Sequence, residues 1–214
     1  MPIIQDYPEP DLNRKPLKIE ELTQDPIAQF DNWLKNAYQE KYPLPNAMSL
    51  ATASSESIPT VRTVLLKNYD KKGFVFYTNY GSRKARQISE NAKASLLFPW
   101  IQLGRQITIF GNVEKISRKE SLDYFHSRPR GSQLGAWASG QSDIISSRKI
   151  LEENFSEIEL RFFDEEVPLP DFWGGYRVLP DSIEFWQNRA DRMHDRFIYN
   201  RTKNGEWTID RLAP

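Results

Sequence analysis

The chain has 214 residues, of which 39% are hydrophobic and 13% aromatic, enough to bury the core of one domain of ordinary size. Its 29 basic and 29 acidic residues cancel, which excludes the strong positive field that binding to nucleic acid or anionic membranes requires. There is no cysteine, and two histidines offer little to a metal ion. We therefore expect no metal centre, and we expect catalysis to depend on a bound cofactor.

The N-terminal region carries no signal for export or membrane insertion. It lacks a basic segment followed by an apolar one, and no later apolar run approaches the roughly 20 residues that span a bilayer. We expect a cytoplasmic protein. Residues 1–24 are polar and contain four prolines, so we predict a flexible N-terminal arm there and a single domain over residues 25–214.

The first half of the predicted domain opens with a helix and continues in strands. Asp25 can cap this helix and Pro26 suits its first position, while apolar residues recur at helical spacing until Pro43. Strands are then predicted at residues 47–53, 60–67 and 74–79, a short helix at 82–91, and strands at 94–102 and 106–116.

The second half reverses this order, with helices first. Ser117 and Glu120 form a capping box that predicts a helix through Phe125, and a further helix is predicted at 146–163. Strands follow at 175–178, 183–187, 197–201 and 206–212, the last two joined by a hairpin turn at Asn204-Gly205. The regular spacing of short strands indicates an antiparallel barrel in a mainly β, α+β fold.

Basic residues recur at the ends of these predicted elements. Arg62 and Lys67 bracket an apolar strand, but their odd separation places them on opposite faces of a regular strand. A bulge or a strand end would be needed to direct both at one ligand. The alternative is that they are two solvated ends of an apolar strand.

The segment 79–85 has the features of a small anion site. A glycine turn leads into a helix whose first turn carries Ser82, Arg83 and Lys84. Free backbone N–H groups and the helix dipole attract an anion there, and the two cations can neutralise it. An ordinary capped surface helix is the alternative.

A second anion site is suggested by Tyr124, Arg128 and Ser132, which recur at a spacing of four. A helical continuation would bring the three together, although Pro129 interrupts a continuous helix. The alternative is a helix C-terminus with a basic end. For His126 we expect a packing role.

A third group lies near the C-terminus. If their segment is extended, Arg192, His194 and Arg196 share one strand face. Like charges gather in this way around an anionic ligand or beside acidic partners, and Asp191 and Asp195 are candidates for such partners.

Eight stretches, taken together, match a known family. They are RTVLLK (62–67), FYTN with GSRKA (76–85), SLLFPW (95–100), YFHSRPR (124–130), GAWASGQS (135–142), PLPDFWGGYR (168–177), EFWQ (184–187) and RMHDRF (192–197). From about residue 25 onward, the sequence resembles the pyridoxamine 5'-phosphate oxidase family. The N-terminal segment departs from the family pattern, because only Arg14 is available where members often carry an Arg-Arg-x-Tyr-like lid sequence.

The resemblance implies an FMN-binding split β-barrel that forms a homodimer with two FMN sites at the subunit interface. It implies FMN contacts from Arg62, Val64, Leu65, Lys67, Tyr77, Thr78, Ser82, Arg83, Lys84, Gln106, Gln141, Ser142, Trp186 and Arg196. It implies substrate contacts from Lys67, Tyr124, Arg128, Ser132, Arg192 and His194. Of these, Arg192 and His194 would be the catalytic pair.

The implied reaction is the oxidation of pyridoxamine 5'-phosphate and pyridoxine 5'-phosphate to pyridoxal 5'-phosphate, in the biosynthesis or salvage of vitamin B6. Oxygen would be the acceptor, with release of hydrogen peroxide and, from the amine, ammonia. Protein side chains do not accept a hydride readily, so FMN would carry the redox step. Two alternatives are another split-barrel flavoenzyme, such as a flavin reductase, and a non-catalytic protein that binds flavin or pyridoxal phosphate.

Overall fold

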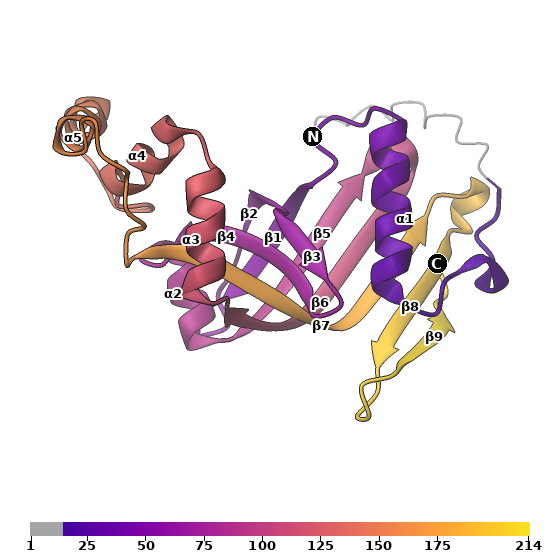
Figure 1. The fold of residues 1–214 in the computed structure, drawn as a ribbon. Helices are drawn as coiled ribbons and strands as arrows, with labels where there is room; N and C mark the ends of the chain where they lie inside the picture. Colours follow the sequence, from indigo (N-terminus) through magenta and orange to yellow (C-terminus); the bar gives the residue numbers. More distant parts are fainter. Residues whose placement is uncertain (1–14) are drawn as a thin grey trace, which may run out of the picture.

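The computed structural model describes residues 15–214, within which nine strands form one antiparallel sheet (Figure 1). The strands are β1 (Ala47–Ala53), β2 (Pro59–Leu65), β3 (Asn68–Asp70), β4 (Gly73–Asn79), β5 (Lys93–Trp100), β6 (Arg105–Lys115), β7 (Trp173–Gln187), β8 (Asp195–Arg201) and β9 (Trp207–Arg211). The helices are α1 (Pro26–Gln39), α2 (Arg83–Glu90), α3 (Arg118–Ser127), α4 (Arg130–Ala138) and α5 (Arg148–Arg161). The predicted antiparallel α+β class is confirmed.

The sheet is organised around β7. β6 pairs with β7 along nearly its whole length, while β4 pairs with residues 173–178 and β8 with residues 182–187. The strand order is β2-β1-β5-β6-β7-β4-β3, and β8 with β9 branches from the C-terminal half of β7. The sheet therefore curls into an open barrel, with the β8–β9 hairpin beside it (Figure 1).

The two strands predicted at 175–178 and 183–187 are one continuous strand, so that prediction is wrong. The register between β6 and β7 shifts at Phe110/Gly111, which leaves Asp181 as the extra residue of a β-bulge beside Pro180. A bulge is where a proline can enter a strand without interrupting the ladder. Gly111 is required opposite it, because an added Cβ would lie 1.9 Å from the Leu179 carbonyl oxygen.

Helix α1 packs its apolar face into the barrel. Phe30 is fully buried, and its ring centre lies 4.9 Å from that of Phe74 and 5.0 Å from that of Phe98, both edge to face. Trp33 meets Phe185 of β7 in the same manner at 5.2 Å. The helical periodicity in the sequence therefore corresponds to the buried face of α1.

The predicted N-cap of α1 is observed, and it gives a first testable prediction. The Asp25 carboxylate accepts a hydrogen bond of 2.9 Å from the Ile27 backbone N–H. We expect Asp25→Ala to lower the free energy of unfolding by about 1 kcal/mol, because an N–H at the helix start loses its acceptor. Asp25→Asn keeps an acceptor and should stay close to wild type in urea-induced unfolding. Equal destabilisation by both substitutions would contradict this assignment.

Part of the segment predicted as a flexible arm belongs to the core. Leu17 and Leu22 are 8% and 7% exposed and join the main buried cluster, so the prediction is wrong for residues 15–24. The Leu17 backbone N–H also donates to Asp195 at 3.0 Å. Two isolated leucines in a polar stretch show no hydrophobic period, which explains why the sequence pattern missed them. Residues 1–14, including Arg14, lie outside the described part.

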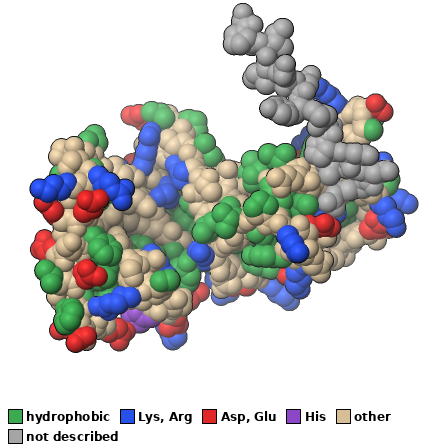
Figure 2. Space-filling view, turned by 90° about the horizontal axis from the view of Figure 1, so that it is seen from above, with side chains coloured by type: hydrophobic (Ala, Val, Ile, Leu, Met, Phe, Trp, Pro, Cys, Tyr) green, Lys and Arg blue, Asp and Glu red, His purple; other side chains and the backbone are tan. Residues whose placement is uncertain are grey.

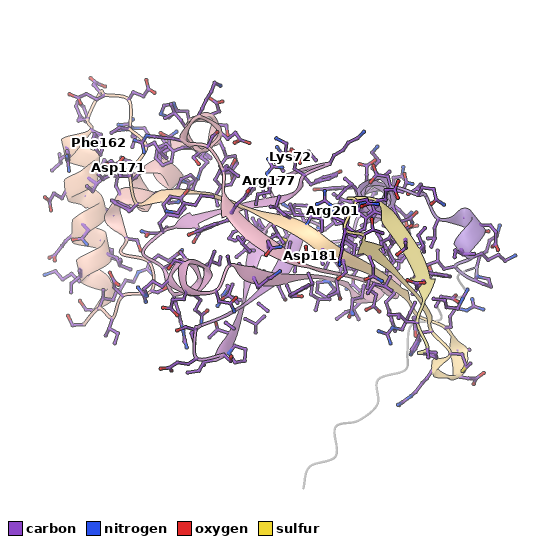
Figure 3. The ribbon with its side chains drawn as sticks, turned by 90° about the horizontal axis from the view of Figure 1, so that it is seen from below. Lys72, Phe162, Asp171, Arg177, Asp181 and Arg201 are labelled. Carbon is purple, nitrogen blue, oxygen red and sulfur yellow. The ribbon has the colours of Figure 1, made fainter. Side chains whose placement is uncertain are left out.

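Helices α3, α4 and α5 form a lobe at one end of the barrel (Figure 1). The lobe has its own buried cluster, made of Phe125, Leu134, Phe162, Val167, Leu169 and Trp173. Figure 3 shows Phe162 and Asp171 at this end of the molecule and Arg177 nearer its middle.

Acidic and basic side chains are interspersed on the face in Figure 2, in agreement with the balanced charge. No helix in residues 15–214 is both long and apolar enough to cross a membrane.

Candidate functional site

An open groove of about 790 Å³ lies where the lobe meets the barrel. Its lining residues are Thr60, Val61, Arg62, Thr63, Val64, Leu65, Lys67, Tyr77, Thr78, Arg83, Lys84, Tyr124, Arg128, Pro129, Ser132, Gln141 and Ser142. Five of these are Lys or Arg, and none of the described residues that line it is Asp or Glu. The groove is therefore a local anion site in a chain with no net charge.

The side chain of Arg62 is positioned by hydrogen bonds to residues of β1 and β2. Its guanidinium donates to the Leu50 carbonyl at 3.0 Å, to the Thr52 hydroxyl at 2.7 Å and to the Thr60 hydroxyl. Both of those threonine hydroxyls also donate to Gln87 at 2.6 Å. Burial, and secondarily the positive charge of Arg83, lowers the pKa of Arg62. Sequence reasoning missed Thr60 and Gln87; the signal that could have found Gln87 is a polar residue on the buried face of α2.

Lys67 reaches the same groove because it lies beyond the end of β2. That strand ends at Leu65, and the Lys67 backbone N–H donates to the Val75 carbonyl at 2.9 Å. Strand alternation therefore no longer applies at Lys67, which resolves the odd spacing from Arg62. Its ammonium lies 6.0 Å from the centre of the Tyr124 ring.

Lys84 is buried at the start of α2 and surrounded by neutral oxygens. Its ammonium donates to Gln141 at 2.8 Å, to Thr78 at 3.1 Å and to Ser82 at 3.3 Å. Burial, and then the charge of Arg62, lowers the pKa of Lys84 to about 8. The Ser82 side chain caps no backbone N–H of α2. The arrangement therefore differs from an ordinary capped surface helix.

Arg128, with Tyr124 and Ser132, closes the other side of the groove. α3 ends at Ser127 and α4 begins at Arg130, so the helical continuation considered for these residues is not present, although all three line the groove. The Arg128 Nη1 atom is buried without a hydrogen-bond partner among the described residues, and burial lowers the pKa of the guanidinium. A buried N–H donor without an acceptor is costly, which fits a position meant for a ligand oxygen.

Two aromatic rings, those of Tyr77 and Tyr124, line the groove beside these cations, and the ring of Trp173 lies next to them. The rings of Tyr77 and Tyr124 stack at 3.9 Å between centres, and Trp173 is nearly parallel to both. The Arg128 guanidinium carbon lies 4.6 Å from the Trp173 ring centre. The groove thus combines flat apolar surface with cations, which suits an aromatic ring that carries a phosphate.

The remaining predicted contacts form a row elsewhere on the sheet. Gln106, Trp186 and Arg196 are paired directly across β6, β7 and β8, and none of them lines the groove. The His194 ring centre is 4.6 Å from that of Trp186. The carboxylate partner of Arg196 is Glu184 at 2.7 Å, and neither Asp191 nor Asp195 takes that position. We name Gln106, Trp186 and Arg196 the β6–β8 row.

The extended conformation considered for residues 192–196 is wrong. Asp191 and Arg192 have φ of 55° and 57°, within a 3-10 turn over Ala190–Arg192, and β8 begins only at Asp195. Aspartate tolerates this left-handed region better than most residues, whereas arginine gives no such signal. Arg192, His194 and Arg196 therefore do not share one strand face.

Comparison with known proteins gives this geometry a context. Residues 34–162 match the family model described as pyridoxamine 5'-phosphate oxidase, and residues 173–214 match the pyridoxine 5'-phosphate oxidase C-terminal dimerisation region. The chain belongs to the pyridoxamine 5'-phosphate oxidase family. As a member it is an FMN-dependent oxidase of pyridoxine and pyridoxamine 5'-phosphates, and it forms a homodimer. The predicted family, cofactor and assembly are confirmed.

Named relatives and solved structures agree with this family. Pyridoxine/pyridoxamine 5'-phosphate oxidase of Aliarcobacter butzleri is 56% identical, covering 92% of this chain and 93% of the relative. That of Crocosphaera subtropica is 55% identical, covering 94% and 95%. PhzG from Burkholderia lata, solved with tetrahydrophenazine-1-carboxylic acid, superposes with a TM-score of 0.86 at 31% identity, covering 91% and 95%. An FMN-binding protein of Nostoc punctiforme has a TM-score of 0.70 at 15% identity, covering 86% and 97%, and supports the fold alone.

Proposed function

We propose that the groove is the active site and that it holds two phosphates at separate places. The FMN phosphate would be bound by Arg62, Ser82, Arg83 and Lys84, and the substrate phosphate by Lys67, Tyr124, Arg128 and Ser132. One observation carries this proposal: five cations surround the groove without a carboxylate among the described residues that line it. Two phosphate monoesters bring about three to four negative charges at neutral pH, which these cations balance.

The remaining groove residues would contact the FMN ring system. Val64, Leu65 and Tyr77 offer apolar surface, while Thr78, Gln141 and Ser142 offer hydrogen-bonding groups. When bound, FMN supplies the hydride acceptor and delivers the electrons to oxygen, which leaves as hydrogen peroxide. The protein's own contribution is to fix the substrate phosphate, so that the opposite end of the pyridine ring is presented in one orientation.

We further propose that each active site is completed by the partner subunit. The β6–β8 row and the catalytic pair Arg192 and His194 lie outside the groove of their own chain. Four of these residues, Trp186, Arg192, His194 and Arg196, fall within the C-terminal dimerisation region at residues 173–214. In the homodimer this surface would face the partner's groove, where Arg192 and His194 would orient the ring and its C4' substituent.

We also propose a cytoplasmic location, which agrees with the absence of cysteine.

An aerobic assay with each vitamer tests the function directly. We expect pyridoxine 5'-phosphate and pyridoxamine 5'-phosphate both to give pyridoxal 5'-phosphate, with one hydrogen peroxide formed per aldehyde, and with ammonia from the amine alone. Binding without oxygen-dependent turnover would indicate a carrier. Oxidation of a reduced nicotinamide by added free flavin, without aldehyde formation, would indicate a flavin reductase.

The lowered pKa of Lys84 predicts how FMN affinity depends on pH. In the free enzyme this ammonium loses its proton above about pH 8, whereas the FMN phosphate is already a dianion at pH 7. Binding above pH 8 must therefore take up a proton, and the Kd for FMN should rise by up to about tenfold per pH unit. Quenching of flavin fluorescence measures this Kd. Lys84→Arg should flatten the dependence, and a wild-type Kd constant from pH 7 to 9.5 would contradict the assignment.

A further inference from the structure

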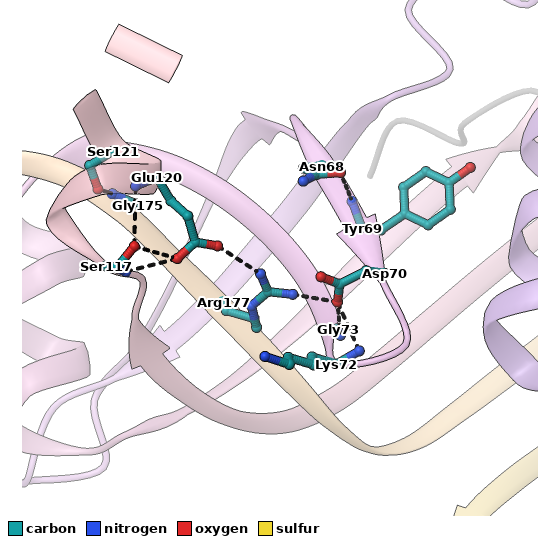
Figure 4. Close-up of polar contacts among 10 residues, drawn as sticks. All are labelled: Asn68, Tyr69, Asp70, Lys72, Gly73, Ser117, Glu120, Ser121, Gly175 and Arg177. Carbon is teal, nitrogen blue, oxygen red and sulfur yellow. Dashed lines mark hydrogen bonds and ion pairs between the residues drawn. The ribbon is translucent and has the colours of Figure 1, made fainter. Parts of the chain in front are cut away.

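Arg177 carries a charge into the interior of the molecule. It lies in β7, and its side chain is 6% exposed. Its guanidinium bonds to Asp70 with Nη1 and to Glu120 with Nη2, the latter at 3.3 Å (Figure 4). These two carboxylates belong to distant parts of the sequence, because Asp70 ends β3 and Glu120 lies in the first turn of α3. One buried cation therefore joins β3 and α3 through β7.

Both carboxylates also organise the segment to which they belong. Asp70 accepts from the backbone N–H groups of Lys72 at 2.8 Å and Gly73 at 3.2 Å, which fixes the turn from β3 to β4. Glu120 accepts from the Ser117 N–H at 3.0 Å and forms the capping box of α3. Arg177 therefore contacts two side chains that already determine local backbone structure (Figure 4).

The same two segments carry the proposed substrate clamp. Lys67 comes directly before β3, and Tyr124 follows Glu120 by one turn of α3. α3 lies tightly against β7: the Gly175 N–H donates to the Ser121 hydroxyl at 3.3 Å, and a Cβ on Gly174 would lie 3.0 Å from the same hydroxyl. The distance of 6.0 Å between the Lys67 ammonium and the Tyr124 ring centre thus depends on how these segments are held.

We propose that Arg177 is a positioning residue for the substrate phosphate, acting by holding Lys67 and Tyr124 at a fixed separation. This proposal rests on the proposed function, in which both residues contact that phosphate. The partner carboxylates of Asp70 and Glu120 are 45% and 50% exposed, and ion pairs to half-exposed carboxylates contribute little to stability, so stability alone is a weak reason for a buried guanidinium here. Without it, β3 and α3 would lose the side chain that contacts both of them, and their carboxylates would be left without this cation.

The test compares ligands that differ only in the phosphate. Arg177→Met is made in the FMN-loaded homodimer, and inhibition constants against pyridoxine 5'-phosphate are measured for pyridoxal 5'-phosphate and for pyridoxal. We expect the inhibition constant for pyridoxal 5'-phosphate to rise about tenfold, which is the effect of weakening one charge-assisted contact. The inhibition constant for pyridoxal should change less than about twofold. The Kd for FMN should stay within about twofold of wild type. Arg177→Lys should recover part of the effect, because an ammonium keeps the positive charge but lacks the planar fork whose two Nη atoms reach the two carboxylates.

A matched control is Arg105→Met. Arg105 also joins two elements, since it donates to Asn36 of α1 at 2.8 Å and to Gln187 of β7 at 3.1 Å, but it does not line the groove. Its loss should lower thermal stability without changing the ratio of the two inhibition constants. If Arg177→Met fails to fold, Asp70→Asn and Glu120→Gln each break one of the two ion pairs of Arg177 and should raise the constant for pyridoxal 5'-phosphate alone.

The outcomes are distinguishable. Equal increases for pyridoxal 5'-phosphate and pyridoxal would mean that Arg177 is merely structural, and an unchanged constant for pyridoxal 5'-phosphate would equally overturn the positioning role. Tyr124→Phe separates this failure from that of the proposed function. If Tyr124→Phe lowers discrimination for the phosphate while Arg177→Met does not, only the role of Arg177 is lost. If neither variant changes it, the phosphate clamp itself is misplaced.

Discussion

Replacing Arg128 with alanine is expected to lower kcat/KM for both phosphorylated vitamers by about 100-fold and to leave FMN bound. The buried Nη1 atom has no protein acceptor in the described part of the chain, so the substrate phosphate would be its partner. A charge-assisted hydrogen bond in such a site contributes about 3 kcal/mol at the upper end, which corresponds to this factor in rate. FMN content is measured first, and initial rates are then measured with excess FMN.

Arg130→Ala is the control for this variant. Arg130 follows Arg128 across Pro129, but it donates to the carbonyls of Phe162 and Glu165 and does not line the groove. Its removal should lower stability while kcat/KM stays near wild type. Should Arg128→Ala keep wild-type kcat/KM, the substrate phosphate is bound elsewhere.

The second large effect is a recovery of activity in hybrid dimers. Arg192→Ala alone should reduce kcat/KM by about 10- to 100-fold, because a charge-assisted contact to the substrate is lost. In an Arg128→Ala/Arg192→Ala hybrid, one subunit carries only Arg128→Ala and the other carries only Arg192→Ala. If the groove comes from one subunit and Arg192 from its partner, one site receives both defects and the other receives neither. The purified hybrid should then have about half of the wild-type activity per dimer.

Two affinity tags allow the hybrid to be isolated after co-expression of both chains. The matched control is a hybrid of Arg192→Ala with His194→Ala. Both of these residues would come from the same subunit, so every site in that hybrid keeps one defect and activity should remain low. An Arg128→Ala/Arg192→Ala hybrid as inactive as its parents would place each complete site within a single chain.

Much of the fold could be predicted because its signals are local. Asp25 with Pro26 marks the start of α1, the capping box of Ser117 and Glu120 marks the start of α3, and β1 has the predicted bounds. Helix α4 was not predicted, since Gly131 and Gly135 lower its helical propensity and its stability comes from burying Leu134 in the lobe. Tertiary packing of this kind leaves no periodic pattern in a short segment.

The candidate site was harder to predict, because its geometry depends on contacts across the chain. The local patterns identified the cations one segment at a time and could not show that Arg62, Lys84 and Arg128 line one groove. That grouping depends on how the lobe sits on the barrel. The conformation of Arg192 was also beyond local reasoning, because nothing in its side chain favours a positive φ.

β7 has a further consequence for how this sequence can change. It runs from Trp173, whose ring stacks with that of the groove residue Tyr77, to Trp186 in the β6–β8 row, roughly 40 Å at the usual rise per residue of a strand. Side chains alternate between faces, so one residue inserted after the bulge would turn Trp186 inward and expose Phe185. The fully buried Phe185 would leave the core in the same step. The number of residues in β7 is thus fixed, because Phe185 must stay buried and Trp186 must stay on the opposite face. Insertions and deletions are tolerated only in the loops outside β7.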